Sequence, residues 1–345
     1  MNLLVTGGAG FIGSNVIRQL LRRSEPTRIV NLDCLTYAGH LENLAGADRD
    51  PRYTFIRADL RDKSKVVEIV KSHAISHVLH LAAESHVDRS ISGPGDFIHT
   101  NIVGTFHLLE ACRDAWAGQF EGRRFHHVST DEVFGSLGES GLFSETTPYA
   151  PNSPYSASKA SSDLIVRAYH HTYGLPCVLT NCSNNYGPYQ FPEKLIPVVI
   201  QKALAHQPIP IYGDGMNVRD WLYVTDHVDA LWQVLTRGRI GETYCIGGGN
   251  EWPNLRIVEK ICDLIDALAP EQGRDSRRLM QFVKDRPGHD RRYAIDAAKI
   301  QNELGWTPAH SFEAGLRATV EWYLGNQEWV KAVTSAKRCD TGVIR

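Results

Sequence analysis

The stretch VTGGAGFIG, residues 5–13, stands between an apolar run and an amphipathic segment, and it carries Gly7, Gly10 and Gly13. Glycine permits a tight turn and lets the backbone come close to a bound pyrophosphate. A helix that begins in this stretch presents free N–H groups and a partial positive charge to the same anion. The spacing therefore predicts a dinucleotide-binding turn between a first strand and a first helix.

A carboxylate after the second apolar run supports this interpretation. Asp33 closes RIVNLD, residues 28–33, and stands twenty residues beyond Gly13. At that place a carboxylate hydrogen-bonds the adenosine ribose hydroxyls and repels a 2′-phosphate, so the pattern favours NAD over NADP. A glycine-rich turn with a capping aspartate is the disfavoured alternative. Asp59 ends the third apolar run, where it could contact adenine or cap a turn.

Apolar runs alternate with helical patterns through the first half of the chain. Strands are predicted at 2–6, 28–33, 53–59, 77–83, 124–130 and 177–182, and helices at 11–23, 62–72, 97–117 and 155–173. This alternation predicts an α/β fold, a Rossmann-type doubly wound parallel sheet with right-handed crossovers. Prolines interrupt the rhythm after about residue 183 and predict a smaller, mixed α/β substrate-binding lobe.

The same patterns give domain boundaries. The NAD-binding Rossmann domain is predicted to comprise residues 1–182 and 218–237. The substrate-binding lobe is predicted to comprise 183–217 and 238–325, and to end in a closing helix. Residues 326–345 are predicted to form a polar C-terminal tail.

Composition disfavours several classes of protein. The 345 residues are 42% hydrophobic with a net charge of −2, which gives no global attraction to nucleic acid or an anionic membrane. Seven scattered cysteines without a CxxC pair are typical of a reduced, cytoplasmic protein. We expect no signal peptide, because glycines follow the N-terminus too early, and no membrane helix, because no apolar run is long enough. Without HExxH or a Cys/His cluster, we expect no metal site.

A second motif, SPYSASKAS at 153–161, places Tyr155 and Lys159 four residues apart on a predicted helix. That spacing puts both side chains on one face. A neighbouring ammonium and a positively charged nicotinamide ring would favour the phenolate, so Tyr155 could take a proton from a sugar hydroxyl while its carbon loses hydride. The motif alone occurs by chance on many helices, and it gains weight here from the glycine turn and from Thr130.

The stretch HHVSTDEVFG, residues 126–135, places two acids side by side where a strand is predicted to end. Neighbouring residues in a strand point to opposite faces. Asp131 and Glu132 can therefore reach one substrate only if the backbone leaves strand geometry at 130–132. Capping of the next segment by either carboxylate is the alternative.

These motifs resemble the extended short-chain dehydrogenase/reductase family and, within it, the dTDP-glucose 4,6-dehydratase family. The resemblance runs from Leu3 to about Tyr323 through GGAGFIGSN, LDCLTYAGHLENL, AAESHVDRSI, VSTDEVFG, PYSASKASSDL, NCSNNYGPYQFPEKLIP and DRPGHDRRYAID. The glycine turn and YxxxK mark only the superfamily, whereas TDE and the NNYGPYQFPEKLIP block mark the dehydratases. Three departures are Cys34 for the usual lysine, Phe134 for the usual tyrosine, and an unusually charged segment at 271–278.

The resemblance implies dehydration of dTDP-glucose to dTDP-4-keto-6-deoxyglucose with NAD regenerated in each cycle. Tyr155 takes the C4 hydroxyl proton while NAD takes the C4 hydride, and Thr130 hydrogen-bonds the C4 oxygen. Glu132 then removes the C5 proton, Asp131 protonates the departing C6 hydroxyl, and hydride returns to C6. The scheme needs a neutral Asp131 beside an ionised Glu132, a difference that the environment must create.

The motifs and the resemblance together assign two sets of binding residues. Cofactor-binding residues are predicted to be Gly7, Gly10, Phe11, Ile12, Gly13, Asp33, Cys34, Leu35, Thr36, Asp59, Leu60, Leu81, Ala82, Ala83, Ser85, Thr100, Tyr155, Lys159 and Asn185. Substrate-binding residues are predicted to be Ser85, His86, Thr130, Asn184, Glu193, Lys194, Leu195, Pro210, Tyr212, Arg219, Asn254, Arg286 and His289. Arg219 and Arg286 are the best candidates for the pyrophosphate, because a guanidinium suits phosphate oxygens. A surface ion pair with Asp220 is the alternative for Arg219.

The resemblance also implies a homodimer through the helices at 97–117 and 155–173, although their apolar stripes could equally pack on the sheet. Three other functions remain open: a dehydratase of a UDP- or CDP-hexose, a nucleotide-sugar 4-epimerase, and a non-catalytic NAD-binding regulator. An epimerase needs Thr130, Tyr155 and Lys159 but neither a C5 base nor a C6 acid, so TDE disfavours it. The complete catalytic set disfavours a regulator.

Overall fold

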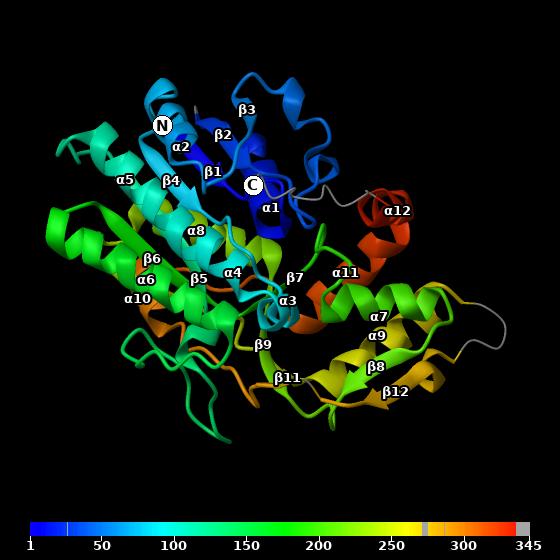
Figure 1. Ribbon diagram of the computed structural model, residues 1–345. Helices are drawn as coiled ribbons and strands as arrows, with labels where there is room; N and C mark the ends of the chain where they lie inside the picture. Colours follow the sequence, from blue (N-terminus) through cyan, green and yellow to red (C-terminus); the bar gives the residue numbers. More distant parts are fainter. Residues whose placement is uncertain (26, 271–274, 286, 336–345) are drawn as a thin grey trace.

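The computed structural model describes residues 1–345 except 26, 271–274, 286 and 336–345. At its centre lies a seven-stranded sheet in the order β10-β6-β5-β4-β1-β2-β3, and every neighbouring pair is parallel (Figure 1). The strands are β1 (Asn2–Thr6), β2 (Arg28–Asp33), β3 (Tyr53–Arg57), β4 (His77–His80), β5 (Arg124–Thr130), β6 (Cys177–Cys182) and β10 (Thr243–Ile246). The predicted Rossmann-type sheet is therefore confirmed, and β3 and β4 end earlier than predicted.

Helices cover both faces of this sheet because each presents an apolar stripe to it. On one face lie α1 (Phe11–Arg22) and α8 (Val224–Arg237), whose buried side chains join one core cluster. On the other face lie α2 (Lys63–Ser72), α5 (Thr105–Trp116) and α6 (Pro154–Tyr173), around a second cluster. Local signals fix the bounds of α6, since Ser153 and Ser156 form a capping box and Gly174 ends the helix in a left-handed conformation.

The predicted helix at 97–117 is divided into three parts. It consists of the end of α4 (Pro94–Phe97), a π-helical segment at Ile98–Gly104, and α5. A Cβ on Gly104 would lie 2.9 Å from the Leu60 Cβ, so the segment approaches its neighbour closely. π-helical turns widen the backbone and are frequent at functional sites.

The smaller lobe contains two small sheets. β11 (Glu251–Pro253), β9 (Val218–Tyr223) and β7 (Asn184–Tyr186) form one, and β12 (Met280–Val283) and β8 (Ile209–Tyr212) form the other. Around them α7 (Leu195–Leu204), α9 (Asn254–Leu268) and α11 (Phe312–Gly325) bury a third apolar cluster. The remaining helical segments are α3 (Val87–Ser92), α10 (Ala298–Leu304), α12 (Gln327–Ser335) and short 3-10 turns at Leu41–Leu44, Ala47–Arg49, Asp131–Phe134 and Ser276–Leu279.

Three predicted boundaries differ from the structure. β10 lies in the large sheet beside β6, whereas the sequence pattern predicts its residues in the smaller lobe. β9 belongs to the smaller lobe through its pairing with β7 and β11, so only α8 of the 218–237 segment returns to the large sheet. Part of the predicted tail is α12, where Trp329 Nε1 donates a hydrogen bond to Asn43 Oδ1 at 2.9 Å. Long-range strand pairing decides the first two differences, and short strands carry little local signal of it. None of the described helices is long and apolar enough to cross a membrane.

Candidate active site

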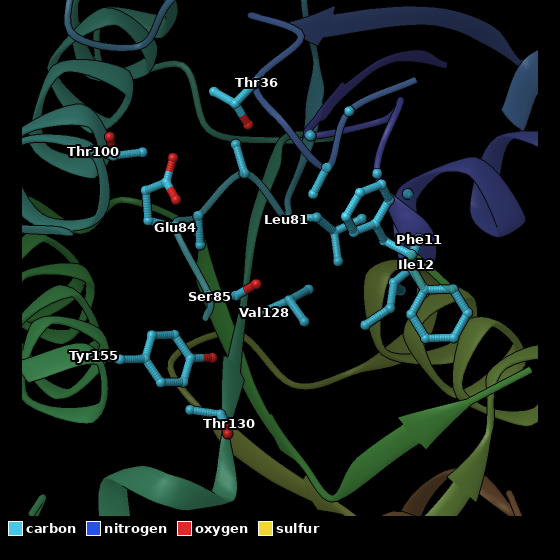
Figure 2. A pocket seen from close by; sticks show the side chains of 18 of the residues that line it. Phe11, Ile12, Thr36, Leu81, Glu84, Ser85, Thr100, Val128, Thr130 and Tyr155 are labelled. Carbon is cyan, nitrogen blue, oxygen red and sulfur yellow. The ribbon is translucent and has the colours of Figure 1, made fainter. Parts of the chain in front are cut away.

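A cavity of about 700 Å³ runs along the carboxyl ends of β1 to β6, where ligands of open parallel sheets bind (Figure 2). The glycine turn lies at one end of the cavity, and Thr130 and Tyr155 lie at the other. Most of the predicted site residues line it: Gly7, Gly10, Phe11, Ile12, Gly13, Asp33, Cys34, Thr36, Asp59, Leu60, Leu81, Ala82, Ala83, Ser85, Thr100, Thr130, Asp131, Glu132, Tyr155, Lys159, Asn184, Asn185, Glu193 and Lys194.

The glycine turn has no room for side chains. Gly7 has φ +71°, and a Cβ there would lie 2.8 Å from the backbone of Ala82. A Cβ on Gly13 would lie 2.2 Å from the Gly7 carbonyl oxygen. Gly10 is the N-cap of α1 and supplies no side-chain cap, so the first-turn N–H groups are left for an anion in the cavity.

Asp33 ties two turns of the cavity wall together. Its Oδ2 accepts a hydrogen bond from the Ala9 N–H at 2.9 Å, and its Oδ1 accepts one from the Leu35 N–H at 2.8 Å. Burial raises the pKa of Asp33, and these two N–H groups oppose the rise. Asp59 forms an ion pair with Arg61 at 2.6 Å. Burial raises the pKa of Asp59, but the contacts with Arg61 outweigh burial, so that the pKa is lowered.

The backbone leaves strand geometry where the two acids begin. Thr130 is the last extended residue of β5, and Asp131–Phe134 form a 3-10 turn. The Thr130 Oγ1 caps this turn by accepting a hydrogen bond from the Glu132 N–H at 3.2 Å. The predicted bend is confirmed, and Thr130 rather than either carboxylate supplies the cap. Asp131 and Glu132 consequently line the same cavity.

The surroundings of Asp131 favour its protonated form. Asp131 is buried, and burial raises its pKa well above the ordinary value, with Glu132 and Asp220 adding to the rise. Arg219 and the Thr130 hydroxyl, which donates to Asp131 Oδ1 at 3.3 Å, oppose it. Among the described residues, Asp131 Oδ2 has no hydrogen-bond partner. Asp131 can therefore carry a proton at neutral pH and donate it into the cavity.

Tyr155 and Lys159 reach the cavity from α6. Figure 2 shows the Tyr155 hydroxyl turned toward Thr130 and Ser85. Burial raises the pKa of Tyr155 well above its ordinary value, Glu132 adds to the rise, and the Thr130 hydroxyl opposes it. Lys159 Nζ donates a hydrogen bond to the Val128 carbonyl at 2.9 Å. A phenolate at Tyr155 needs positive charge nearby, and a nicotinamide ring is a group that would bring it.

The remaining predicted residues lie apart from the cavity wall. These are Leu35, His86, Leu195, Pro210, Tyr212, Arg219, Asn254 and His289, while Arg286 lies outside the described residues. Arg219 is buried, donates to the carbonyls of Val218 and Asp290 at 2.8 and 2.9 Å, and lies 4.1 Å over the Tyr293 ring. The neighbouring Asp220 accepts the N–H groups of Gly248 and Asn250.

Sequence reasoning missed part of the wall. Two loops meet across the cavity, where the Tyr37 hydroxyl donates to Glu193 Oε1 at 3.0 Å and Phe191 stacks on His40 with ring centroids 5.3 Å apart. The missed lining residues are Leu32, Tyr37, Ala38, Gly39, Ala58, Arg61, Glu84, Arg89, Asp96, Val128, Ser129, Cys182, Ser183, Gln190 and Phe191. Several stand inside the quoted stretches, but loop residues follow no periodicity that would single them out.

Comparison with known proteins adds independent findings. Residues 4–319 match the family described as GDP-mannose 4,6 dehydratase. A dTDP-glucose 4,6-dehydratase of Xanthomonas campestris pv. campestris (strain B100) is 58% identical over 335 residues, 96% of this chain and 95% of that relative. The crystal structure of DesIV, the dTDP-glucose 4,6-dehydratase of Streptomyces venezuelae, with NAD bound has a TM-score of 0.89 at 47% identity and covers 96% and 100% of the two chains. A Thermus thermophilus UDP-glucose 4-epimerase complex with NAD has a TM-score of 0.83 at 32% identity, covering 94% and 100%.

Proposed function

The chain belongs to the nucleotide-sugar 4,6-dehydratase family that includes the dTDP-glucose enzymes, and we propose that it converts dTDP-glucose to dTDP-4-keto-6-deoxyglucose with bound NAD. One observation carries this proposal within the family fold. Asp131 and Glu132 line the same cavity as Thr130, Tyr155 and Lys159, so an acid pair lies beside an oxidation site. A 4-epimerase has no use for such a pair, because it neither removes a C5 proton nor expels a C6 hydroxyl.

The cavity suits NAD. The crowded glycines and the open first turn of α1 suit a pyrophosphate, and Asp33 stands where the adenosine ribose hydroxyls would lie. When bound, NAD supplies the acceptor and later the donor of the hydride. Asn184, Glu193 and Lys194, which line the cavity from the smaller lobe, support placing the nucleotide sugar between the two lobes.

The first proton transfer belongs to Tyr155. Its hydroxyl would take the proton of the sugar C4 hydroxyl, while Thr130 holds the C4 oxygen. Lys159, fixed against Val128, supplies positive charge to the phenolate. The product of this stage is a 4-keto sugar, whose carbonyl makes the C5 proton acidic enough for a carboxylate to remove.

Water loss belongs to the acid pair. Glu132 would remove the C5 proton, and Asp131 would protonate the departing C6 hydroxyl, which leaves as water. When hydride returns to C6, protonated Glu132 would give a proton back to C5, so that the 4-keto-6-deoxy sugar is complete. Burial raises the pKa of Asp131 and so favours its protonated form, which is the state that a general acid needs. The two roles demand opposite protonation states, and the Glu132 charge helps create the difference by raising the Asp131 pKa.

The test is incubation of the purified protein with dTDP-glucose, followed by absorbance of the 4-keto product in base. We expect product with no more than catalytic NAD. UDP-glucose and CDP-glucose measured in parallel test the other dehydratase functions, and loss of the C5 hydrogen to solvent distinguishes dehydration from epimerisation. A folded protein that forms no product from dTDP-glucose at any NAD concentration would contradict the proposal.

The proposed enzyme is a homodimer. Large apolar side chains are exposed on the π-helical segment, α5 and α6, including Ile98 at 49%, Phe106 at 37% and Leu164 at 58% exposure. α5 and α6 pack beside each other on one face of the sheet (Figure 1), so these side chains can meet a second copy. Sedimentation should give a dimer, and Leu164→Arg should give a monomer.

The six described cysteines are all free, which supports a reducing compartment such as the cytoplasm.

A further inference from the structure

One buried carboxylate beside the active site has no part in the reaction scheme. Asp163 lies on α6, one helical turn beyond Lys159, and its side chain has no exposed surface. It does not line the cavity, so it does not touch a bound sugar there. Burying a charge costs free energy unless hydrogen bonds or an opposite charge compensate it, so Asp163 must have such partners.

The partners of Asp163 come from three other parts of the fold. Its Oδ2 accepts hydrogen bonds from the Ser129 hydroxyl of β5 at 2.8 Å, the Tyr149 hydroxyl at 3.0 Å and the Asn181 amide of β6 at 3.3 Å. Its Oδ1 lies 3.1 Å from His127 Nε2. Burial raises the pKa of Asp163 to about 6, while Lys159 and the three hydrogen-bond donors oppose the rise. The carboxylate is thus ionised above about pH 6.

Lys159 is also buried and stands four residues before Asp163 on α6, a spacing that puts both side chains on one face of the helix. Burial lowers the pKa of Lys159, and Asp163 is the foremost influence that opposes the loss of its proton. Besides Tyr155 on the same helix face, the titratable groups that interact with Lys159 are His80 on β4, His127 on β5 and Cys182 on β6. Burial lowers the pKa of both histidines and raises that of Cys182 to about 12, so all three are uncharged at neutral pH. Within the described part of the chain, Asp163 is then the counter-charge.

We propose that Asp163 is a positioning residue of the active site, whose carboxylate keeps Lys159 in its ammonium form and clamps the strand ends that carry Thr130. The clamp runs through Asn181, whose amide donates both to Asp163 and to the Thr130 carbonyl at 3.0 Å. Ser129, the neighbour of Thr130, is held by the same oxygen. The inference rests on the proposed function, because it assumes that the Lys159 charge favours the Tyr155 phenolate.

The test measures the pH dependence of NAD reduction by dTDP-glucose in a Glu132→Gln background, where the reaction should stop after the first stage. Asp163→Asn keeps the shape of the side chain and removes its charge. We expect the alkaline limb of the rate profile to move down by about one pH unit, because Lys159 loses its proton more easily. Tyr149→Phe is the matched control, since it removes one hydrogen bond and leaves the carboxylate. Its alkaline limb should stay in place.

The outcomes separate the two proposals. Equal rate losses at every pH in both variants would make Asp163 merely structural and overturn the inference. Failure of the Glu132→Gln parent to reduce NAD at any pH would instead contradict the division of labour between Tyr155 and Glu132. A folded wild-type protein that forms no product from dTDP-glucose would refute the proposed function.

A second measurement covers the case in which Asp163→Asn does not fold alone. Lys159→Met leaves the carboxylate buried without its cation, so Lys159→Met/Asp163→Asn should melt at a higher temperature than Lys159→Met. A double variant that melts at the same or a lower temperature would also overturn the inference.

Discussion

The Thr130 hydroxyl accepts a hydrogen bond from the Glu132 N–H at 3.2 Å, and this contact turns the chain out of β5. The same hydroxyl donates a hydrogen bond to Asp131. It also opposes the rise that burial causes in the pKa of Tyr155. One hydroxyl thus joins Tyr155, the proposed base of the oxidation, to the acid pair proposed for the elimination. Loss of its oxygen should disturb both stages of the proposed reaction.

Thr130→Val should therefore lose the cap and the C4 contact together. We expect destabilisation of about 1 kcal/mol from the lost cap, and a lower rate of NAD reduction. Thr130→Ser keeps the hydroxyl oxygen and should recover most of the stability and most of the rate of NAD reduction. Thermal unfolding and single-turnover NADH absorbance check the two effects. A valine variant as active as the parent would remove Thr130 from the mechanism.

Glu132→Gln should separate oxidation from elimination. Tyr155 and Lys159 remain, so NADH should form from dTDP-glucose and persist, while the C5 proton stays in place. Rapid-scan absorbance and C5 hydrogen exchange give the two readouts. Exposed Glu139→Gln is the control and should behave as the parent. If Glu132→Gln cannot reduce NAD at all, the proposed division of labour is wrong.

Asp131→Asn should slow water loss by about 100- to 10,000-fold, the usual contribution of a general acid. Because the proposed general acid acts in its protonated form, the parent rate should fall as pH rises through the raised Asp131 pKa. The asparagine variant should lack that alkaline limb. Rate profiles of product formation test this, with exposed Asp48→Asn as control. An unchanged alkaline limb in Asp131→Asn would assign the titration to another group.

Gly7→Ala should abolish NAD binding, because its Cβ would lie 2.8 Å from the Ala82 backbone at a positive φ. Gly46 also has a positive φ, but a Cβ there would meet none of the described atoms within 4 Å, which makes it a matched control. Gly46→Ala should cost about 1 kcal/mol of stability and leave NAD affinity intact. Calorimetric titration with NAD distinguishes the two variants. Equal NAD affinities would argue against the glycine turn as the cofactor cradle.

Acid should destabilise the protein through its buried histidines. Burial lowers the pKa of His227 from 6.5 to about 3, so the unfolded chain takes up a proton that the folded protein refuses. The contribution of neutral His227 to the free energy of unfolding is present above pH 6.5. It is lost as the pH falls from 6.5 toward 3, because protons then bind the unfolded chain. His227→Leu should make the melting temperature less dependent on pH in this interval, whereas exposed His171→Gln should not. Parallel melting curves in all three proteins would contradict the prediction.

The sequence by itself determined the six first strands, the glycine turn and the helix that carries Tyr155 and Lys159. Local patterns predict each of them: apolar runs, capping residues such as Ser153, and glycines at which a Cβ would clash with neighbouring backbone. The resemblance suggested the roles proposed for the acid pair, and the bend at 130–132 was expected because neighbouring strand residues point to opposite faces. These features depend on residues close together in the chain.

Tertiary structure alone decided where distant segments meet. β10 joins the large sheet by pairing with β6, 64 residues away at Leu179 and Thr243, and no local pattern records that choice. The same holds for Asp163, whose partners Ser129 and Asn181 stand 34 and 18 residues away. Its importance is visible only when burial and charge are known together. A buried carboxylate is stabilised by whatever the fold brings around it, and sequence spacing does not contain that information.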